Sequence, residues 1–340
     1  MTSVSSRAAL LVAAAGCGGH LKLTPIDASV QRPSNIAVYF TVDTSGGEPV
    51  PGLTAESFRI YEDEKPVSVL ESKQTILNPE VAASHYTLLL IDMSGSVTGS
   101  GDVPVIQDAA RAFGERVQKY QKVAVYAFDG SPGIYPIVGF GGGGGVAGGI
   151  AHLGTFRARD PSTNLNGGII QALRVLHQRM ATAPTPLSFG TLVVFTDGTD
   201  RAARVPREEL HKELAGAPVG VLVIGVGAEI DERELSTIGR DGTILNKDRA
   251  QIAAAFDQAA ARVEAYSKRY YLLGYCSPAR AGQHEVRIET SVDGRSGSLR
   301  YPFNAEGFGP DCDPTRTPAF NVRRPKPPRS APLEEGGRHF

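Results

Sequence analysis

An apolar run over residues 88–91 ends abruptly at Asp92, and two hydroxyl residues, Ser94 and Ser96, follow at intervals of two. A run of this kind is typical of a buried strand in a parallel sheet. Ligands of open α/β sheets bind just beyond the carboxyl ends of such strands. One carboxylate and two hydroxyls in a tight turn suit a hard divalent cation, Mg²⁺ or Mn²⁺, held by oxygen atoms alone. The same pattern is also ordinary turn chemistry, because Asp and Ser side chains bond to their own backbone.

Two further segments favour the metal site over the turn. A polar loop around Thr163 precedes a segment with helical periodicity, and a second apolar run, over 191–195, ends at Thr196 and Asp197. The order and context of these segments resemble the von Willebrand factor A (VWA) domain and its metal-ion-dependent adhesion site (MIDAS). By that resemblance, the five site positions are matched by Asp92, Ser94, Ser96, Thr163 and Asp197.

The resemblance also implies how such a site works. Ser94, Ser96 and one of Thr163 or Asp197 would bind the metal directly, and the remaining acids would act through water. One coordination position would stay open for a carboxylate from a partner. The sequence departs from the family pattern at Pro161, which stands where family members often have Gly, and this bears on the shape of the loop. Asp129 and Asp200 also follow strands, and we interpret them as turn and cap residues.

The periodicity of the chain predicts an α/β fold. Strands alternate with helices from 84 to 267, which indicates a doubly wound, mostly parallel sheet of the VWA, Rossmann-like kind. The flanking segments 33–80 and 270–312 alternate as β-strands, and neither is large enough to be stable alone. We therefore expect the two segments to pair into one small β-sandwich, with the α/β domain inserted between them.

The sequence predicts that both ends of the chain lie outside the folded core. Residues 1–16 have the pattern of a signal peptide, and 14–17 resemble a bacterial lipobox, with Cys17 as the lipidated residue. Plain secretion is the alternative. Residues 17–32 are then a lipid-anchor linker. Gly at position 18, directly after the cysteine, resembles the pattern of lipoproteins that are sent to the outer membrane. The Pro- and Arg-rich segment 313–340 predicts a disordered tail.

If Cys17 carries lipid, two cysteines remain, Cys276 and Cys312. In an oxidising cell envelope, an even remainder favours a disulfide between them. Two free thiols are the alternative.

Composition and motifs limit the classes of function that the sequence predicts. A formal net charge of −1 argues against a general nucleic-acid surface. No nucleophile–base motif accompanies the predicted metal site, so we expect no enzyme. The sequence predicts a lipid-anchored protein of the bacterial cell envelope that binds an acidic side chain of a protein partner through Mg²⁺ or Mn²⁺. The alternatives are a structural assembly subunit whose metal only stabilises the fold, and a Mg²⁺-dependent hydrolase.

Overall fold

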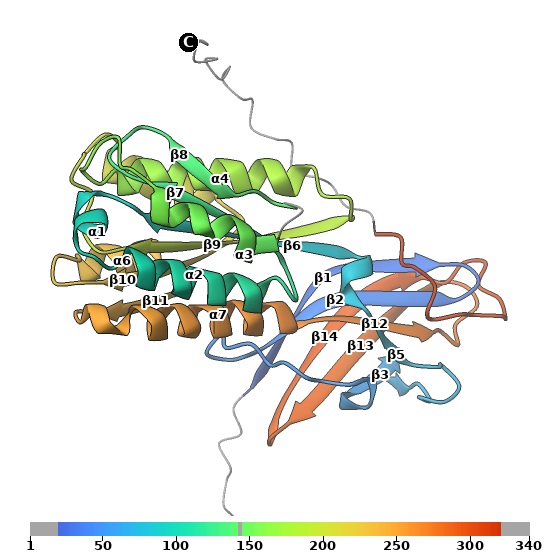
Figure 1. Cartoon of the computed structure of the whole chain (residues 1–340). Coiled ribbons are helices and arrows are strands. Elements are labelled where there is room, and N and C mark those ends of the chain that lie inside the picture. The colour runs from blue at the N-terminus through green and yellow to red at the C-terminus, as the bar shows by residue number, and fades with distance from the viewer. Residues whose placement is uncertain (1–19, 142–144, 321–340) are drawn as a thin grey trace, which may run out of the picture.

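The computed structural model describes residues 20–141 and 145–320. A six-stranded sheet carries helices on both faces, and a β-sandwich of two four-stranded sheets lies at one end of it (Figure 1). The predicted fold class, an α/β domain inserted in a small β-sandwich, is therefore confirmed. Among the described residues, no helix combines the length and apolar character needed to cross a membrane.

The six-stranded sheet is mostly parallel, as predicted. Its order is β11-β10-β9-β6-β7-β8, and only the edge strand β8 runs antiparallel to its neighbour, β7. The central strand β6 is almost entirely buried and β9 is buried over 192–196, which explains their continuous apolar runs. The strand bounds are β6 Ala83–Asp92, β7 Lys122–Phe128, β8 Ile134–Val138, β9 Leu187–Thr196, β10 Gly220–Val226 and β11 Gly242–Asn246.

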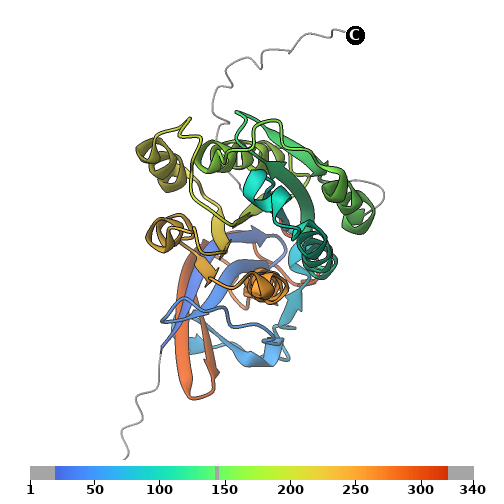
Figure 2. The same ribbon diagram turned by 60° about the vertical axis from the view of Figure 1, so that its left-hand side comes forward.

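Each face of this sheet is covered by its own helices and has its own apolar core (Figure 2). One face carries α2 (Val103–Val117), α3 (Gly145–Ile150), η3 (Ala151–Thr155) and α7 (Ile252–Lys268), and the other carries α4 (Leu165–Ala181), α5 (Arg207–Gly216) and α6 (Glu232–Ile238). Two short helices, α1 (Gly95–Gly99) and η4 (Arg249–Gln251), follow β6 and precede α7 respectively.

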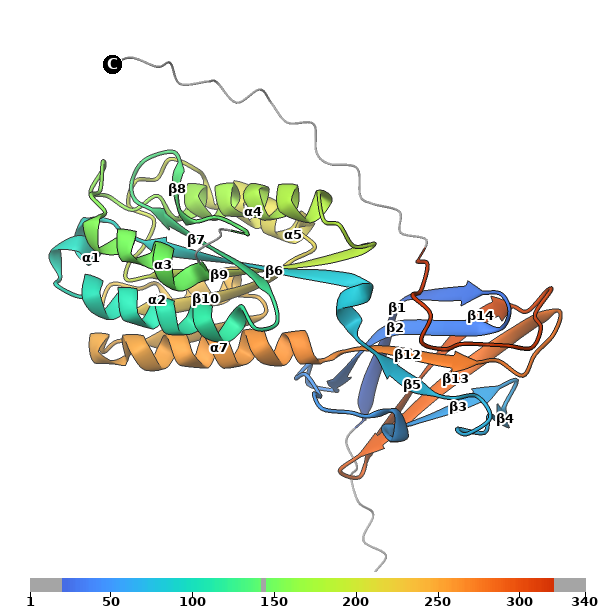
Figure 3. The same ribbon diagram turned by 45° about the vertical axis from the view of Figure 1, so that its right-hand side comes forward.

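The β-sandwich is built from both ends of the chain (Figure 3). One sheet has the order β1-β2-β12-β5 and the other β14-β13-β3-β4, so a C-terminal strand lies between N-terminal strands in the first sheet. Aromatic side chains of β2, β3 and β12 pack between the sheets. The elements are β1 Leu21–Gln31, β2 Asn35–Thr44, η1 Ala55–Ser57, β3 Phe58–Glu62, β4 Lys65–Pro66, β5 Thr75–Leu77, η2 Pro79–Val81, β12 Tyr270–Cys276, β13 Gln283–Val292 and β14 Arg295–Asn304.

Two predicted boundaries need correction. The segment predicted as a linker, 17–32, contains β1, which pairs antiparallel with β2. The predicted disordered tail, 313–340, begins with packed residues: the ring of Phe320 lies 6.3 Å from that of Tyr39, centroid to centroid. The predicted signal peptide and Cys17 lie outside the described residues, and so does 321–340.

The predicted disulfide is present. Cys276, at the end of β12, is bonded to Cys312, with 5.8 Å between their Cα atoms. It ties β12, an inner strand of one sandwich sheet, to the segment that leaves the other sheet after β14.

An aromatic cluster joins the sandwich to the α/β domain. His85 on β6 stacks on Phe189 of the neighbouring β9 at 5.1 Å and meets Tyr270 of β12 edge-on at 4.8 Å, both centroid to centroid. Burial in this cluster, with a further contribution from the Arg269 cation, lowers the pKa of His85 to about 4. The imidazole therefore stays neutral in the folded protein at neutral pH.

This histidine should make the stability of the protein depend on pH. Between pH 6.5 and about 4, the unfolded chain protonates His85 and the folded chain does not, so the free energy of unfolding falls as the pH falls. The full effect is about 3 kcal/mol. This loss of stability can be measured by urea unfolding at pH 7 and pH 4.5. The wild type is compared with His85→Phe, which keeps an aromatic ring. The wild type should lose more stability than the variant, and equal losses would contradict the assignment.

Candidate functional site

The candidate site lies where β6 and β9 end. These strands are parallel neighbours, with Ile91 opposite Phe195, so Asp92 and Thr196 leave the same edge of the sheet side by side. The hydroxyl of Thr196 donates a hydrogen bond to Oδ2 of Asp92 at 2.7 Å. The sequence predicted Asp92 and missed this partner, although Thr196 directly precedes the predicted Asp197.

Asp92 is a fully buried carboxylate. Its Oδ1 accepts a hydrogen bond from the backbone N–H of Ser94 at 2.9 Å. Burial raises the pKa of Asp92 to about 6, although the hydrogen bonds from Ser94 and Thr196 oppose the rise. Burial disfavours the charged form of this carboxylate, so a cation bound nearby would stabilise that charged form.

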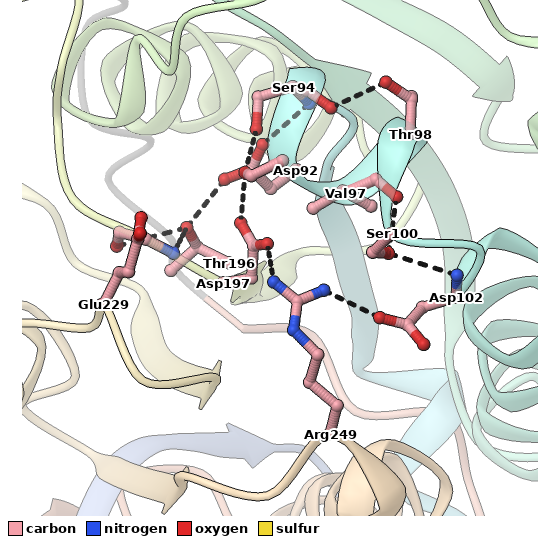
Figure 4. A network of polar contacts seen from close by, with 12 residues as sticks. Asp92, Ser94, Val97, Thr98, Ser100, Asp102, Thr196, Asp197, Glu229 and Arg249 are labelled. Atoms are coloured by element: carbon pink, nitrogen blue, oxygen red, sulfur yellow. Dashed lines mark hydrogen bonds and ion pairs between the residues drawn. The ribbon is translucent and has the colours of Figure 1, made fainter.

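Hydroxyl groups connect this carboxylate to a second one (Figure 4). Ser94 precedes α1 and its Oγ lies 3.2 Å from Oγ of Ser96, in the first turn of that helix. The Ser96 hydroxyl donates to Oδ1 of Asp197 at 2.8 Å. Asp92, Ser94, Ser96 and Asp197, here called the hydroxyl–carboxylate cluster, are thus joined by hydrogen bonds across two strand ends.

The Thr163 loop lies against this cluster. The N–H of Gly95 donates to the carbonyl of Pro161 at 2.8 Å, and a Cβ at position 95 would come within 2.9 Å of that oxygen. The loop with Pro161 therefore still approaches α1 closely. Thr163 is buried, and its carbonyl accepts from the N–H of Ala202 at 2.9 Å, but no hydrogen bond joins its hydroxyl to the cluster within the described residues.

The other two acids at strand ends hold loops, as expected of turn and cap residues. Asp129 is fully buried and accepts hydrogen bonds from the backbone N–H groups of Ser131 and Arg159 at 2.8 and 2.7 Å. Asp200 accepts from the N–H of Asn166 in the first turn of α4 at 3.3 Å. Asp129 thereby fixes the start of the segment that carries Thr163.

One charged residue of the site was not predicted. Arg249, in η4, donates from Nη2 to Oδ2 of Asp197 at 2.6 Å and from Nη1 to Oδ2 of Asp102 at 2.7 Å (Figure 4). The two acids hold the pKa of the guanidinium above its usual range, against the effect of its partial burial. No local sequence signal marks Arg249, because its partners lie 52 and 147 positions away.

The donor atoms of the cluster fit a hard divalent cation. In the part of the chain that the structure describes, no group of three or more His, Cys, Asp or Glu side chains could hold a metal. The cluster instead offers hydroxyl and carboxylate oxygens, the ligands that suit Mg²⁺ and Mn²⁺. The Ser94 hydroxyl lies next to that of Ser96, and a hydroxyl oxygen that donates its proton keeps lone-pair capacity for a metal.

No family model and no curated protein matches the chain. A von Willebrand factor type A structure from Catenulispora acidiphila is similar with a TM-score of 0.46 at 13% identity, over 84% of this chain and 73% of that one. The ArnB paralog VWA2 from Sulfolobus acidocaldarius gives 0.42 at 15%, over 84% and 74%.

A third similar structure is proximal thread matrix protein 1 from the mussel byssus, with a zinc-occupied MIDAS motif. Its TM-score is 0.40 at 16% identity, over 53% of this chain and 48% of that one. At these identities and scores, the three likenesses carry no functional argument for this chain.

Proposed function

We propose that this chain is a binding protein of the VWA type that holds a divalent metal ion in its hydroxyl–carboxylate cluster and binds a protein partner through that metal. The observation that carries the proposal is the chain of contacts from Asp92 through Ser94 and Ser96 to Asp197 at the ends of two adjacent strands. A metal bound there would supply a Lewis-acidic centre for a carboxylate of the partner.

The residues of the chain would divide the work. Ser94 and Ser96 would present their hydroxyl oxygens to the ion, while Asp92 and Asp197 would offset its charge from the buried side. Thr163 would complete the set from its own loop, which is held against α1 by the contact between Gly95 and Pro161. The preferred ion in this proposal is Mg²⁺ or Mn²⁺, because every donor is an oxygen atom.

The same proposal places the protein in the bacterial cell envelope. Its support is the sequence alone: a signal-like segment over 1–16, the lipobox-like 14–17 and Cys17 as the site of a lipid anchor, with an outer-membrane destination. The disulfide between Cys276 and Cys312 suits the oxidising conditions of that compartment. We propose no catalytic role, and no nucleic-acid partner for a chain of net charge −1.

A second candidate is a structural assembly subunit whose metal contributes stability alone. The contacts of Asp197 favour it: one carboxylate oxygen accepts from Ser96 and the other from Arg249, so both oxygens already have partners within the protein. This reading predicts that Mg²⁺ raises the melting temperature without creating any metal-dependent binding.

Affinity capture separates the two candidates. Residues 18–340, made without lipid, would be immobilised and exposed to envelope extract with Mg²⁺ or with chelator. We expect a partner that the wild type captures with Mg²⁺ alone and that Asp197→Ala does not capture. Asp200→Ala is the matched control, because it removes a carboxylate from the loop that also carries Asp197. The Asp200 side chain caps α4 and is not part of the hydroxyl–carboxylate cluster. An identical catch in all lanes would reject the metal-bridged reading and favour the structural one.

A further inference from the structure

Arg249 is a built-in cation of the candidate metal site. Its guanidinium donates from η4 to Oδ2 of Asp197 (Figure 4), whereas the Ser96 hydroxyl donates to Oδ1. The Asp197 side chain is 3% exposed, whereas that of Arg249 is 38% exposed, so the ion pair joins a buried acid to a partly solvated base. The guanidinium therefore already offsets part of the negative charge of this buried carboxylate.

The surrounding residues hold the guanidinium in this position. Asp102, just before α2, accepts its second hydrogen bond at 2.7 Å, so the planar group bridges two carboxylates. Gly227 lies beside the pair: a Cβ there would come within 3.9 Å of Arg249 Nη2 and 3.1 Å of the Asp197 carbonyl oxygen. Three segments that are distant in sequence therefore cooperate to place a positive charge on an acid of the cluster.

A divalent ion and a guanidinium that contact the same carboxylate weaken each other's binding to it. Their like charges repel, and each reduces the negative charge that is available to the other. The repulsion is moderated here by the solvent exposure of Arg249 and by the second acid, Asp102. Its sign is fixed nonetheless, because the guanidinium stays protonated at any physiological pH.

We propose that Arg249 sets the metal affinity of this site, lowering it by holding Asp197 in an ion pair. The inference rests on the proposed function and deepens it, since it assigns the regulation of affinity to a residue outside the five site positions. In this role Arg249 is a positioning residue that acts through Asp197.

Calorimetric titration of the unlipidated chain with Mn²⁺ as the only added metal tests this proposal. Arg249→Gln should raise the affinity for Mn²⁺ about tenfold at low salt, because the competing charge is gone. Arg249→Lys keeps the charge and should remain within about threefold of the wild type. That rescue by charge distinguishes repulsion from a purely structural role, in which both variants would behave alike.

The chain offers a closely matched control. Arg116 on α2 also bridges two acids, Asp257 at 2.9 Å and Glu264 at 2.7 Å, and its side chain is 36% exposed. Arg116→Gln makes the same change in net charge away from the cluster and should leave Mn²⁺ binding unchanged. If the wild type binds Mn²⁺ and Arg249→Gln binds it equally or more weakly, the inference is overturned and the proposed function stands. If neither the wild type nor any variant binds Mn²⁺, the proposed function itself fails, and the inference fails with it.

Discussion

Replacing Ser94 by alanine is expected to lower the affinity for Mg²⁺ at least about 100-fold and to abolish metal-dependent partner binding. The change removes one oxygen that the proposal assigns directly to the ion, whereas substitutions that act indirectly on metal sites typically cost 10- to 100-fold. The fold should survive, because the lost hydroxyl makes hydrogen bonds only with its neighbours Ser96 and Asp92, worth about 1–2 kcal/mol each. Calorimetric titration with Mg²⁺, together with a melting curve in chelator, measures both effects.

The control for this experiment is a serine on another helix. Ser236→Ala also removes a hydroxyl, which donates to the carbonyl of Glu232 at 2.7 Å on α6. It should bind Mg²⁺ like the wild type. Equal Mg²⁺ affinity in the wild type and Ser94→Ala would remove Ser94 from the site and refute the proposed coordination.

Replacing both Cys276 and Cys312 by serine is expected to lower the free energy of unfolding by about 4 kcal/mol. The disulfide spans 36 positions, and in the chain-entropy model closing a loop of that length restricts the unfolded chain by about this amount. Urea unfolding of the two proteins under oxidising conditions gives the difference.

A reducing agent provides the matching control, since it should destabilise the wild type toward the level of the variant and leave the variant unchanged. Metal affinity should be equal in the two proteins, because the disulfide lies in the sandwich and the hydroxyl–carboxylate cluster lies at the ends of β6 and β9. Identical urea midpoints would show that the bond contributes little to stability.

Much of the fold could be predicted because burial leaves a local pattern in the sequence. Strands β6 and β9 are buried on both faces, and their apolar runs therefore stop where the sheet ends, at Asp92 and Asp197. Helix α2 buries one stripe, and its apolar residues recur with the helical period. The same reasoning predicted that the two terminal β segments pair, because neither could bury enough surface alone.

The prediction failed where the local pattern is interrupted. Strand β1 begins with an alternation at Leu21 and Leu23, but the register shifts between Pro25 and Asp27, and most of the strand is partly exposed. A proline and a bulge at a sheet edge disrupt the period-two pattern. The segment therefore reads as a polar linker although it pairs along its length with β2.

The residue types of the site and their positions at strand ends could be predicted without a structure, since the end of a buried strand is a local property of the chain. Which distant residues meet there depends on how the whole chain folds. Arg249 reaches Asp197 because η4 is brought beside the end of β9, and β12 lies between β2 and β5 because the chain returns to the sandwich after α7. Periodicity reports how much of each element is buried, but the partner of a side chain depends on the path of the whole backbone.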